Sequence, residues 1–254
     1  MREAYLVLPR AAMSAETTID RLVGDWRIVQ LRAGHRFSTD DFLTAWLAVD
    51  ARPNALRLLD LGSGIGSVGL MTLYHLSRDA QLTMVEAQEV SHALAKETVA
   101  LNALTNVTAI LGDLRETRLE GSFDLVTGSP PYIPPGKGIA SSNPQRAHAR
   151  IELRGDVFDY CAAAARVLAE DGVFCFCHAA QDPRPDQAIV ASGLTLVRRV
   201  DVHFRRGREP TIALFEARRT GTRVPAQKIV VREDDGEWTA QYRSIRERMA
   251  ALVW

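Results

Sequence analysis

The chain has 254 residues, 46% of them hydrophobic, which is enough for the core of one large domain or two small ones. Its 31 basic and 31 acidic residues cancel, which excludes a global electrostatic attraction to nucleic acid or membrane and leaves only local patches for such partners. Three cysteines without framework spacing exclude a disulfide scaffold, and no apolar run approaches the ~20 residues of a membrane span.

The first residues carry little pattern. Residues 1–17 have no clear period and are predicted to be an N-terminal extension. The apolar run Tyr5–Leu8 is too short for the core of a signal peptide, and Arg10 follows it. We therefore expect a cytoplasmic protein.

A β-hairpin and a helix are predicted next. Apolar runs at 18–23 and 26–30 flank Gly24-Asp25, a pattern typical of two strands joined by a tight turn. Thr39 or Asp40 can cap the helix that follows. The apolar side of this helix is Phe42, Leu43, Trp46 and Leu47.

From Arg57 onward the pattern alternates between strand and helix. The predicted strands are Arg57–Leu61, Leu82–Glu86, Val107–Leu111, Asp124–Thr127, Val173–Cys177, Leu194–Val202 and Ile212–Ala217. The predicted helices are Val68–Ser77, Val90–Leu104, Val157–Leu168 and Pro185–Ala191. This alternation implies right-handed crossovers and a mostly parallel sheet. No helical pattern separates the last two strands, so they are expected to form an antiparallel hairpin that closes the sheet.

The remaining patterns point to packing. Cys175 and Cys177 stand two apart in a predicted strand, so they should share a face, as small buried residues rather than as metal or redox groups. The six histidines form no ligand-spaced cluster, so no metal is expected. Near the end, apolar residues recur at helical spacing and are expected to face the core: Trp238, Tyr242, Ile245, Met249 and Leu252.

A glycine-rich turn indicates a nucleotide-type cofactor. The predicted strand Arg57–Leu61 runs into Gly62-Ser63-Gly64-Ile65-Gly66, and a predicted helix follows. Glycines suit a turn that is tight and whose backbone must touch a ligand. Dinucleotide-binding proteins share such a fingerprint, so the loop alone does not identify the cofactor.

Three carboxylates at strand ends favour S-adenosyl-L-methionine. Asp60 directly precedes the glycine loop. Glu86 ends the next strand, where an acid can accept both ribose hydroxyls, and Asp113 follows the third, where it can meet the adenine amine. A sulfonium cofactor favours carboxylates near its cationic end, whereas a dinucleotide would want a helix N-terminus facing pyrophosphate.

The segment Ser129-Pro130-Pro131-Tyr132 follows the fourth predicted strand, at the edge where open α/β sheets bind ligands. Ser129 Oγ and the Pro130 carbonyl could accept hydrogen bonds from a planar amine, in a direction that the prolines fix. Tyr132 offers a face on which a base could stack. The segment therefore indicates a pocket for a planar amine or amide.

This segment is similar to the Asn/Asp/Ser-Pro-Pro-Tyr/Phe/Trp signature of amino-methyltransferases that act on adenine, cytosine or glutamine amide. From about Thr18 the chain resembles the bacterial tRNA adenine-N6 methyltransferase family that modifies valine tRNA beside the anticodon. Further similar segments are Gln30 with Gly34–Asp40, Gln145-Arg146 with Ala149-Arg150, Lys228–Arg232, and Tyr242. The chain departs from that family at Ser129, where asparagine is usual, and in its extra residues 1–17.

The resemblance implies a class I S-adenosyl-L-methionine-dependent methyltransferase. Its fold class is α/β, a doubly wound, mostly parallel, seven-stranded Rossmann-like sheet with an antiparallel last strand. Residues 18–254 would be the methyltransferase domain, with the hairpin and helix of residues 18–50 capping the cofactor site. The implied cofactor contacts are Phe37, Thr39, Asp40, Asp60, Gly62, Ser63, Gly64, Gly66, Glu86, Ala87, Asp113, Leu114 and Ser129. Ser129, Pro130 and Tyr132 would hold the acceptor.

Arginines are the candidate contacts for RNA. Residues 198–223 hold a local positive excess that could follow an RNA backbone or be a solvated hairpin. Arg205, Arg206 and Arg208 are its candidate substrate contacts. Arg146, His148 and Arg150 could form the lip of the substrate pocket, or a salt-bridge cluster with Glu152 and Asp156.

The acceptor stays open at this point. The first hypothesis is adenine in tRNA or another structured RNA. The second is a small-molecule amine or a protein glutamine amide, and the serine at position 129 favours both this hypothesis and the third. The third is a cofactor-binding module without catalysis.

Overall fold

The computed structural model of the protein describes residues 16–133, 145 and 151–250. The strands in these residues are β1 Thr17–Val23, β2 Trp26–Leu31, β3 Arg57–Leu61, β4 Gln81–Glu86, β5 Val107–Leu111, β6 Phe123–Gly128, β7 Leu168–Ala179, β8 Thr195–His203, β9 Ile212–Arg218 and β10 Gln227–Val230. The helices are α1 Thr39–Ala51, α2 Ser67–Tyr74, α3 Glu89–Leu101, α5 Val157–Val167, α6 Arg184–Ala191 and α7 Ala240–Arg248. Every strand and helix predicted between Arg57 and Ala217 is confirmed, β3 and β5 with their predicted bounds.

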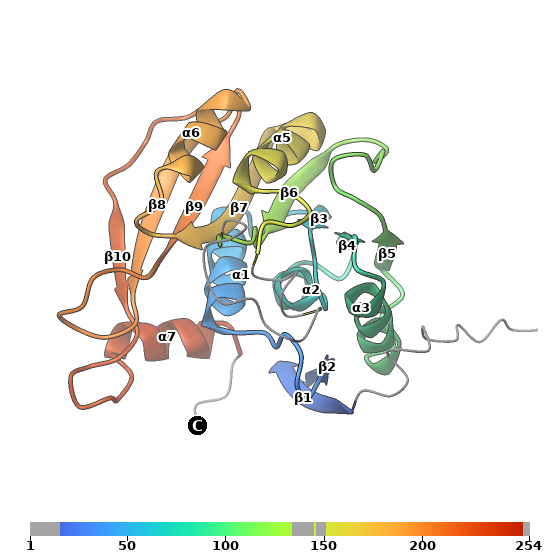
Figure 1. Cartoon of the computed structure of the whole chain (residues 1–254), viewed down its shortest axis with the longest axis horizontal. Helices are drawn as coiled ribbons and strands as arrows, with labels where there is room; N and C mark the ends of the chain where they lie inside the picture. Colours follow the sequence, from blue (N-terminus) through green and yellow to red (C-terminus); the bar gives the residue numbers. More distant parts are fainter. Residues whose placement is uncertain (1–15, 134–144, 146–150, 251–254) are drawn as a thin grey trace, which may run out of the picture.

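A mixed sheet forms the centre of the described structure (Figure 1). Its order is β10-β8-β9-β7-β6-β3-β4-β5. The chain runs outward from β3 through β4 to β5, and then returns to place β6 on the other side of β3, all in parallel. The strand order therefore reverses between β3 and β6, and ligands of open α/β sheets bind at the carboxyl ends of such a pair.

The far half of the sheet corrects one prediction. β9 is antiparallel to both β7 and β8, as the expected hairpin requires. The hairpin does not close the sheet, however, because β10 pairs in parallel with β8 and makes the sheet eight-stranded rather than seven-stranded. β10 has four residues with two of them exposed, so it gave no strand pattern of its own, although the resemblance of Lys228–Arg232 to a late strand fell on it.

Helices cover both faces of the sheet. α1, α2 and α3 contribute to one hydrophobic cluster, and α5 and α6 to another on the opposite face. Successive side chains of β7 point to opposite faces of the sheet. Cys175 and Cys177 belong to the first cluster, whereas Phe174 and Phe176 belong to the second. All three cysteines are free and buried, which confirms the burial predicted for Cys175 and Cys177.

The predicted N-terminal hairpin is confirmed, and β1 and β2 pair as a separate antiparallel ribbon. It packs beside α3, where the Val29 amide donates to Thr98 Oγ1 over 3.0 Å. The predicted helix cap is wrong: Ser38, with extended backbone, is the N-cap of α1, and Asp41 completes a capping box with it. In α7, Tyr242 and Ile245 are buried as predicted, while Leu252 lies outside the described residues.

No helix in the described part of the chain is long and apolar enough to cross a membrane.

Candidate active site

A cavity of about 670 Å³ opens where the strand order reverses. Its walls include residues that follow β3, β4, β5 and β6: Gly62 and Gly64, Glu86 and Ala87, Asp113 and Leu114, and Ser129 to Tyr132. The segment between β2 and α1 supplies Gly34, His35, Arg36, Ser38, Asp40 and Asp41. The structure thus brings the predicted glycine loop and the predicted Pro-Pro-Tyr segment to one cavity.

The glycine loop has the conformation that its composition predicts. Gly62, Gly64 and Gly66 all have positive φ, between 56° and 88°, where other residues are strained. A Cβ on Gly62 would lie 1.9 Å from the Tyr160 hydroxyl oxygen, whereas one on Gly64 would meet no atom within 4 Å. Gly64 therefore leaves its backbone open to a ligand in the cavity. Gly66 is the N-cap of α2 and does not line the cavity.

Asp60 lies beneath the loop rather than in the cavity wall. The side chain is buried, its Oδ1 accepts from Thr127 Oγ1 over 2.8 Å, and its Oδ2 accepts from the Gly69 amide over 2.9 Å. Burial raises the pKa of Asp60 to about 6, although both hydrogen bonds oppose the rise. The carboxyl thus joins β3, β6 and the first turn of α2, and positions the loop instead of facing a ligand.

Glu86 lines the cavity at the end of β4. Its Oε2 accepts from the Gly64 amide and its Oε1 from the Gln88 amide, each over 2.7 Å. Burial raises the pKa of Glu86, and these amides oppose the rise. The Glu86 side chain therefore fixes the glycine loop to the end of β4. It lies at the strand end where a ribose contact was predicted.

Asp113 also lines the cavity, but its carboxylate has a local partner. Arg115 donates from Nε to Oδ1 over 2.9 Å and from Nη2 to Oδ2 over 2.6 Å. This contact lowers the pKa of Asp113. The arginine therefore competes for the oxygens that were expected near adenine.

The segment before α1 reaches the cavity through fewer residues than predicted. Asp40 lies in the wall. Phe37 packs against the core instead, and its amide donates to Gln30 Oε1 over 3.0 Å. Neither Thr39 nor Ser63 is among the wall residues of the described chain. Sequence spacing placed these residues near the ligand but could not tell which side chains turn inward.

The Pro-Pro-Tyr segment meets both α1 and β7. The Tyr132 hydroxyl donates to Asp40 Oδ2 over 3.3 Å, and its ring lies edge-on to His178 at 5.8 Å between centroids. Ser129 Oγ lies 3.4 Å from Cys177 Sγ. The cavity wall thus continues from the predicted cofactor contacts to the predicted acceptor contacts.

Several wall and supporting residues were not predicted as site residues. Asp41 lines the cavity although it is 5% exposed, and the buried Tyr160 lies under the glycine loop. Gln145, quoted only as part of a similar segment, is buried and accepts from the His35 amide over 2.7 Å. The capping-box spacing from Ser38 could have indicated Asp41. No local signal pointed to the contacts of Tyr160 and Gln145, which join segments far apart in the chain.

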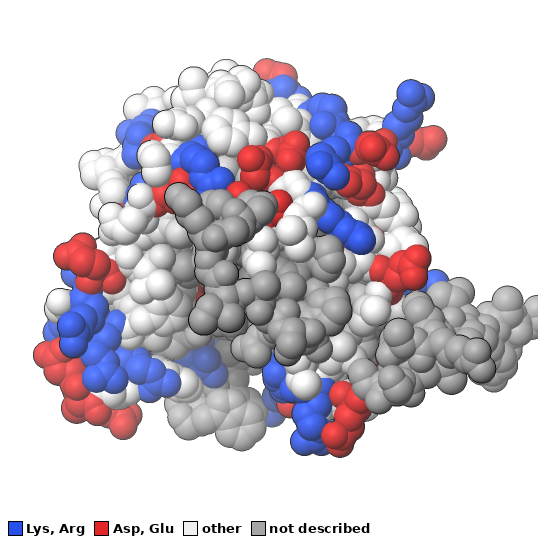
Figure 2. Space-filling model, in the orientation of Figure 1, with Lys and Arg blue, Asp and Glu red and all other residues white. Residues whose placement is uncertain are grey.

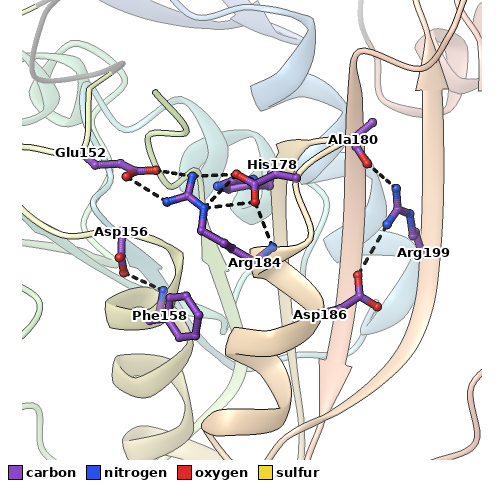
Figure 3. A network of polar contacts seen from close by, with 9 residues as sticks. Glu152, Asp156, Phe158, His178, Ala180, Arg184, Asp186 and Arg199 are labelled. Carbon is purple, nitrogen blue, oxygen red and sulfur yellow. Dashed lines mark hydrogen bonds and ion pairs between the residues drawn. The ribbon is translucent and has the colours of Figure 1, made fainter. Parts of the chain in front are cut away.

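An ion-pair network holds the chain that returns after the Pro-Pro-Tyr segment (Figure 3). Arg184, at the start of α6, pairs with Glu152 over 2.8 Å and with Asp182 over 2.6 Å. Asp182 Oδ2 lies 3.8 Å from Nδ1 of His178, the ring that contacts Tyr132. Asp156 caps α5 through the Phe158 amide. The predicted lip residues Arg146, His148 and Arg150 lie outside the described residues.

Most of the arginine-rich hairpin is neutralised. Arg198, Arg199, Arg206, Arg218 and Arg223 pair with carboxylates, and Arg219 donates to backbone carbonyls. Figure 2 shows acidic and basic side chains side by side over the face drawn. Arg205 and Arg208 are exposed and have no side-chain partner among the described residues. Their loop borders the cavity, since Phe204 and Thr211 line it.

No group of three or more His, Cys, Asp or Glu side chains in the described part of the chain could hold a metal ion.

Comparison with known proteins adds to this geometry. The family model described as "Methyltransferase small domain" matches residues 38–181. A Salmonella choleraesuis protein named tRNA1(Val) (adenine(37)-N6)-methyltransferase is 27% identical over 228 residues, covering 88% of this chain and 85% of that protein. A protein of the same name from Erwinia tasmaniensis is 34% identical over 150 residues, covering 57% of this chain and 58% of that protein.

Solved structures are similar in fold. A predicted O-methyltransferase from Agrobacterium tumefaciens, Atu636, superposes with a TM-score of 0.60 at 19% identity, covering 84% of this chain and 98% of that one. At this identity the likeness supports the fold alone, and it includes the mostly parallel sheet on which the cavity is built.

Proposed function

The chain belongs to the methyltransferase small domain family, and from this premise we propose that it methylates the exocyclic N6 amine of an adenine in tRNA. Its cofactor is S-adenosyl-L-methionine. The observation that carries the proposal is the shared cavity, in which Glu86 and the open backbone of Gly64 face the same space as Ser129 and Tyr132. Proteins named for tRNA adenine methylation match most of the chain, which supports the choice of acceptor.

The cavity fits this cofactor. A buried carboxylate at the end of β4 suits ribose hydroxyls, and Gly64 leaves its backbone open to contact. Glu86, Gly62 and Gly64 would hold the nucleoside part, with Ala87, Asp113 and Leu114 beside the adenine ring. Asp40 would lie toward the methionine end. Asp60, Ser63, Gly66, Phe37 and Thr39 would position these segments from behind.

When bound, the cofactor supplies a methyl group that its positive sulfur already activates. The protein must therefore align the acceptor nitrogen with the methyl–sulfur bond and exclude water. Ser129 Oγ and the Pro130 carbonyl would accept hydrogen bonds from the amine, which makes its nitrogen more pyramidal and more nucleophilic. Tyr132 would stack on the base. The new N–C bond replaces the S–C bond, and the amine releases one proton to solvent.

Residues 18–254 form the methyltransferase domain in this proposal, and a protein that acts on tRNA is placed in the cytoplasm. Because the hairpin β1–β2 packs beside α3, the loop after it would cap the cofactor rather than the hairpin itself. Arg205 and Arg208 would contact tRNA phosphates at the rim of the cavity, and Arg146, His148 and Arg150 remain candidate contacts for the acceptor.

A second acceptor class has one observation in its favour. Ser129 presents a short hydroxyl that lies beside Cys177, where the similar family has an amide, and most arginines near the cavity are already paired. A small-molecule amine or a protein glutamine amide would suit such a pocket through the same chemistry. A cofactor-binding module without catalysis would bind the cofactor and label nothing.

Transfer of a radiolabelled methyl group to three pools distinguishes these functions. The pools are unmodified tRNA, total protein and small metabolites, each incubated with the full chain and labelled cofactor. We expect the label in tRNA. Label in protein or metabolites alone would move the acceptor to the second class, and cofactor binding without label in any pool would indicate a binding module.

A further inference from the structure

Asp41 is a buried acid in the wall of the cofactor cavity. It is the third residue of α1, its side chain is 5% exposed, and it lines the cavity beside Asp40. One carboxylate oxygen accepts from the Ser38 amide over 3.0 Å, within the capping box of the helix. Its position is therefore fixed by the start of α1.

The groups around Asp41 are acidic or neutral. Asp40 stands beside it on α1, Asp60 approaches from β3, Ser67 from α2 and Cys177 from β7. No cation forms an ion pair with Asp41 among the described residues. Burial, and next the charge of Asp40, raise the pKa of Asp41 to about 7, while the Ser38 amide opposes the rise. A carboxyl group with this pKa is partly protonated at neutral pH.

The basic groups of the same cavity are directed elsewhere. Arg36 pairs with Asp20 over 2.8 Å and Arg32 with Glu16 over 2.9 Å. Arg154 donates to the Ala87 carbonyl and acts on Glu86 and Asp113. The His35 ring is the remaining titratable group in this part of the wall. A positively charged ligand would therefore give Asp41 a cationic partner that these arginines do not supply.

When bound, the cofactor would have its positive sulfur on this side of the cavity. The transferred methyl must face the acceptor, so the sulfur that carries it must lie close to Ser129 and Tyr132. Tyr132 is hydrogen-bonded to Asp40, which brings the start of α1 against the acceptor segment. Asp40 therefore lies at this junction of the wall, and Asp41 follows it in the first turn of α1.

We propose that Asp41 gives up its proton when S-adenosyl-L-methionine binds and becomes the counter-charge of the sulfonium. The O–H bond of the carboxyl breaks, the proton passes to solvent, and no bond of the cofactor changes. After methyl transfer the sulfur of S-adenosyl-L-homocysteine is neutral, so Asp41 takes a proton back. The preference of the site for the methyl donor over its product consequently grows as pH rises through 7, and it levels off near pH 8. This inference rests on the cofactor assignment and not on the identity of the acceptor.

The direct test is titration calorimetry of the full chain with each ligand. Binding at pH 7.0 is measured in phosphate and in Tris, whose different ionisation enthalpies reveal the protons exchanged. We expect S-adenosyl-L-methionine to release up to about half a proton more than S-adenosyl-L-homocysteine, and its affinity to rise about tenfold from pH 6 to pH 8. Because Glu86 serves both ligands alike, its own titration cancels in this comparison.

Two variants assign the proton. Asp41→Asn keeps an oxygen for the Ser38 amide and is expected to abolish the difference between the ligands. Glu97→Gln is the matched control, since burial also raises the pKa of Glu97, on α3 outside the cavity wall, and the difference should persist.

Equal proton release with both ligands in the wild type would overturn the proposal, and this comparison needs no variant to fold. So would a difference that survives Asp41→Asn. Absence of any binding of S-adenosyl-L-methionine would overturn the cofactor assignment itself, a failure that is distinct from binding without proton release.

Discussion

Asp41 and Asp60 are two buried acids, of which Asp41 lines the cavity and Asp60 lies behind its wall. The sequence led us to expect a cofactor contact for Asp60 and none for Asp41. Asp60 was predicted to touch the cofactor because it ends a strand before a glycine loop, yet both of its oxygens accept from the protein. Asp41 was not predicted, yet it faces the cavity. Position along a strand or helix is readable from the sequence, whereas the direction of a short side chain depends on partners such as Thr127 that lie far away in the chain.

The pKa of Asp41 predicts how the stability of the cofactor-free protein depends on pH. An acid whose pKa is higher in the folded state than in the unfolded state binds more protons when folded, so its stabilisation is lost as pH rises from about 4 to about 7. Asp41→Asn should therefore raise the free energy of unfolding by about 1–3 kcal/mol at pH 8 and change it little near pH 4.

Urea unfolding at the two pH values measures this difference. Asp60→Ala serves as the contrast, because it removes the acceptor of the Gly69 amide and should destabilise the fold at both. A variant Asp41→Asn that is less stable than wild type at pH 8 would refute the prediction.

Glu86 should matter for the cofactor more than for the fold. Glu86→Ala removes hydrogen bonds between a charged group and the ligand, and we expect cofactor binding to weaken by ~1.5–3 kcal/mol. The variant also frees the Gly64 and Gln88 amides, so its folding must be checked by circular dichroism. Calorimetry that showed unchanged affinity would remove Glu86 from the site.

Two substitutions of Tyr132 distinguish the contribution of ring stacking from that of its hydroxyl hydrogen bond. Tyr132→Ala should cost ~1–3 kcal/mol of interaction with the acceptor, the range for stacking of a base on an aromatic ring, and should leave cofactor affinity nearly unchanged. Tyr132→Phe keeps the ring and removes the hydroxyl that donates to Asp40, so it should retain most of the turnover. Full turnover by the alanine variant would contradict the assignment of the Pro-Pro-Tyr segment.

At the scale of the elements, the arginine-rich hairpin needs its partners to be interpreted. The sequence showed an excess of positive charge between residues 198 and 223, but it could not show that the carboxylates of Asp50, Asp186 and Glu233 pair with arginines of this hairpin. These ion pairs join separate elements and have no local pattern. They leave Arg205 and Arg208 as the exposed charges beside Phe204, at the rim of the cavity.

Binding of tRNA should therefore depend on two arginines rather than on the whole hairpin. Arg205→Ala with Arg208→Ala should weaken binding and reduce the slope of log K against log salt by ~0.7–0.9 for each phosphate that an arginine no longer neutralises. Arg223→Ala, which removes an exposed arginine paired with Asp186, is the matched control and should change the slope little. Equal slopes in wild type and the double variant would exclude phosphate binding by these two arginines.

At the scale of the whole molecule, the fold followed from the sequence because parallel sheets bury nearly continuous apolar runs between helices, such as Leu58–Leu61, which only Asp60 interrupts. The central strands and their crossovers were predicted for this reason. β10 was absent from the predicted sheet because it is short and half exposed, and its pairing with β8 depends on residues about 25 positions away along the chain. The cavity was predicted through its glycine loop and its Pro-Pro-Tyr segment, each of which has a pattern of its own.

The central claim is that this cavity joins a methyl donor to an adenine amine of tRNA. The most direct measurement is to incubate the protein with unmodified tRNA and S-adenosyl-L-methionine, digest the tRNA to nucleosides, and identify the methylated nucleoside by mass spectrometry. We predict N6-methyladenosine, in an amount that Tyr132→Ala strongly reduces at the same enzyme concentration. Methylation of a different nucleoside, or unmodified tRNA beside labelled protein or metabolites, would contradict the claim.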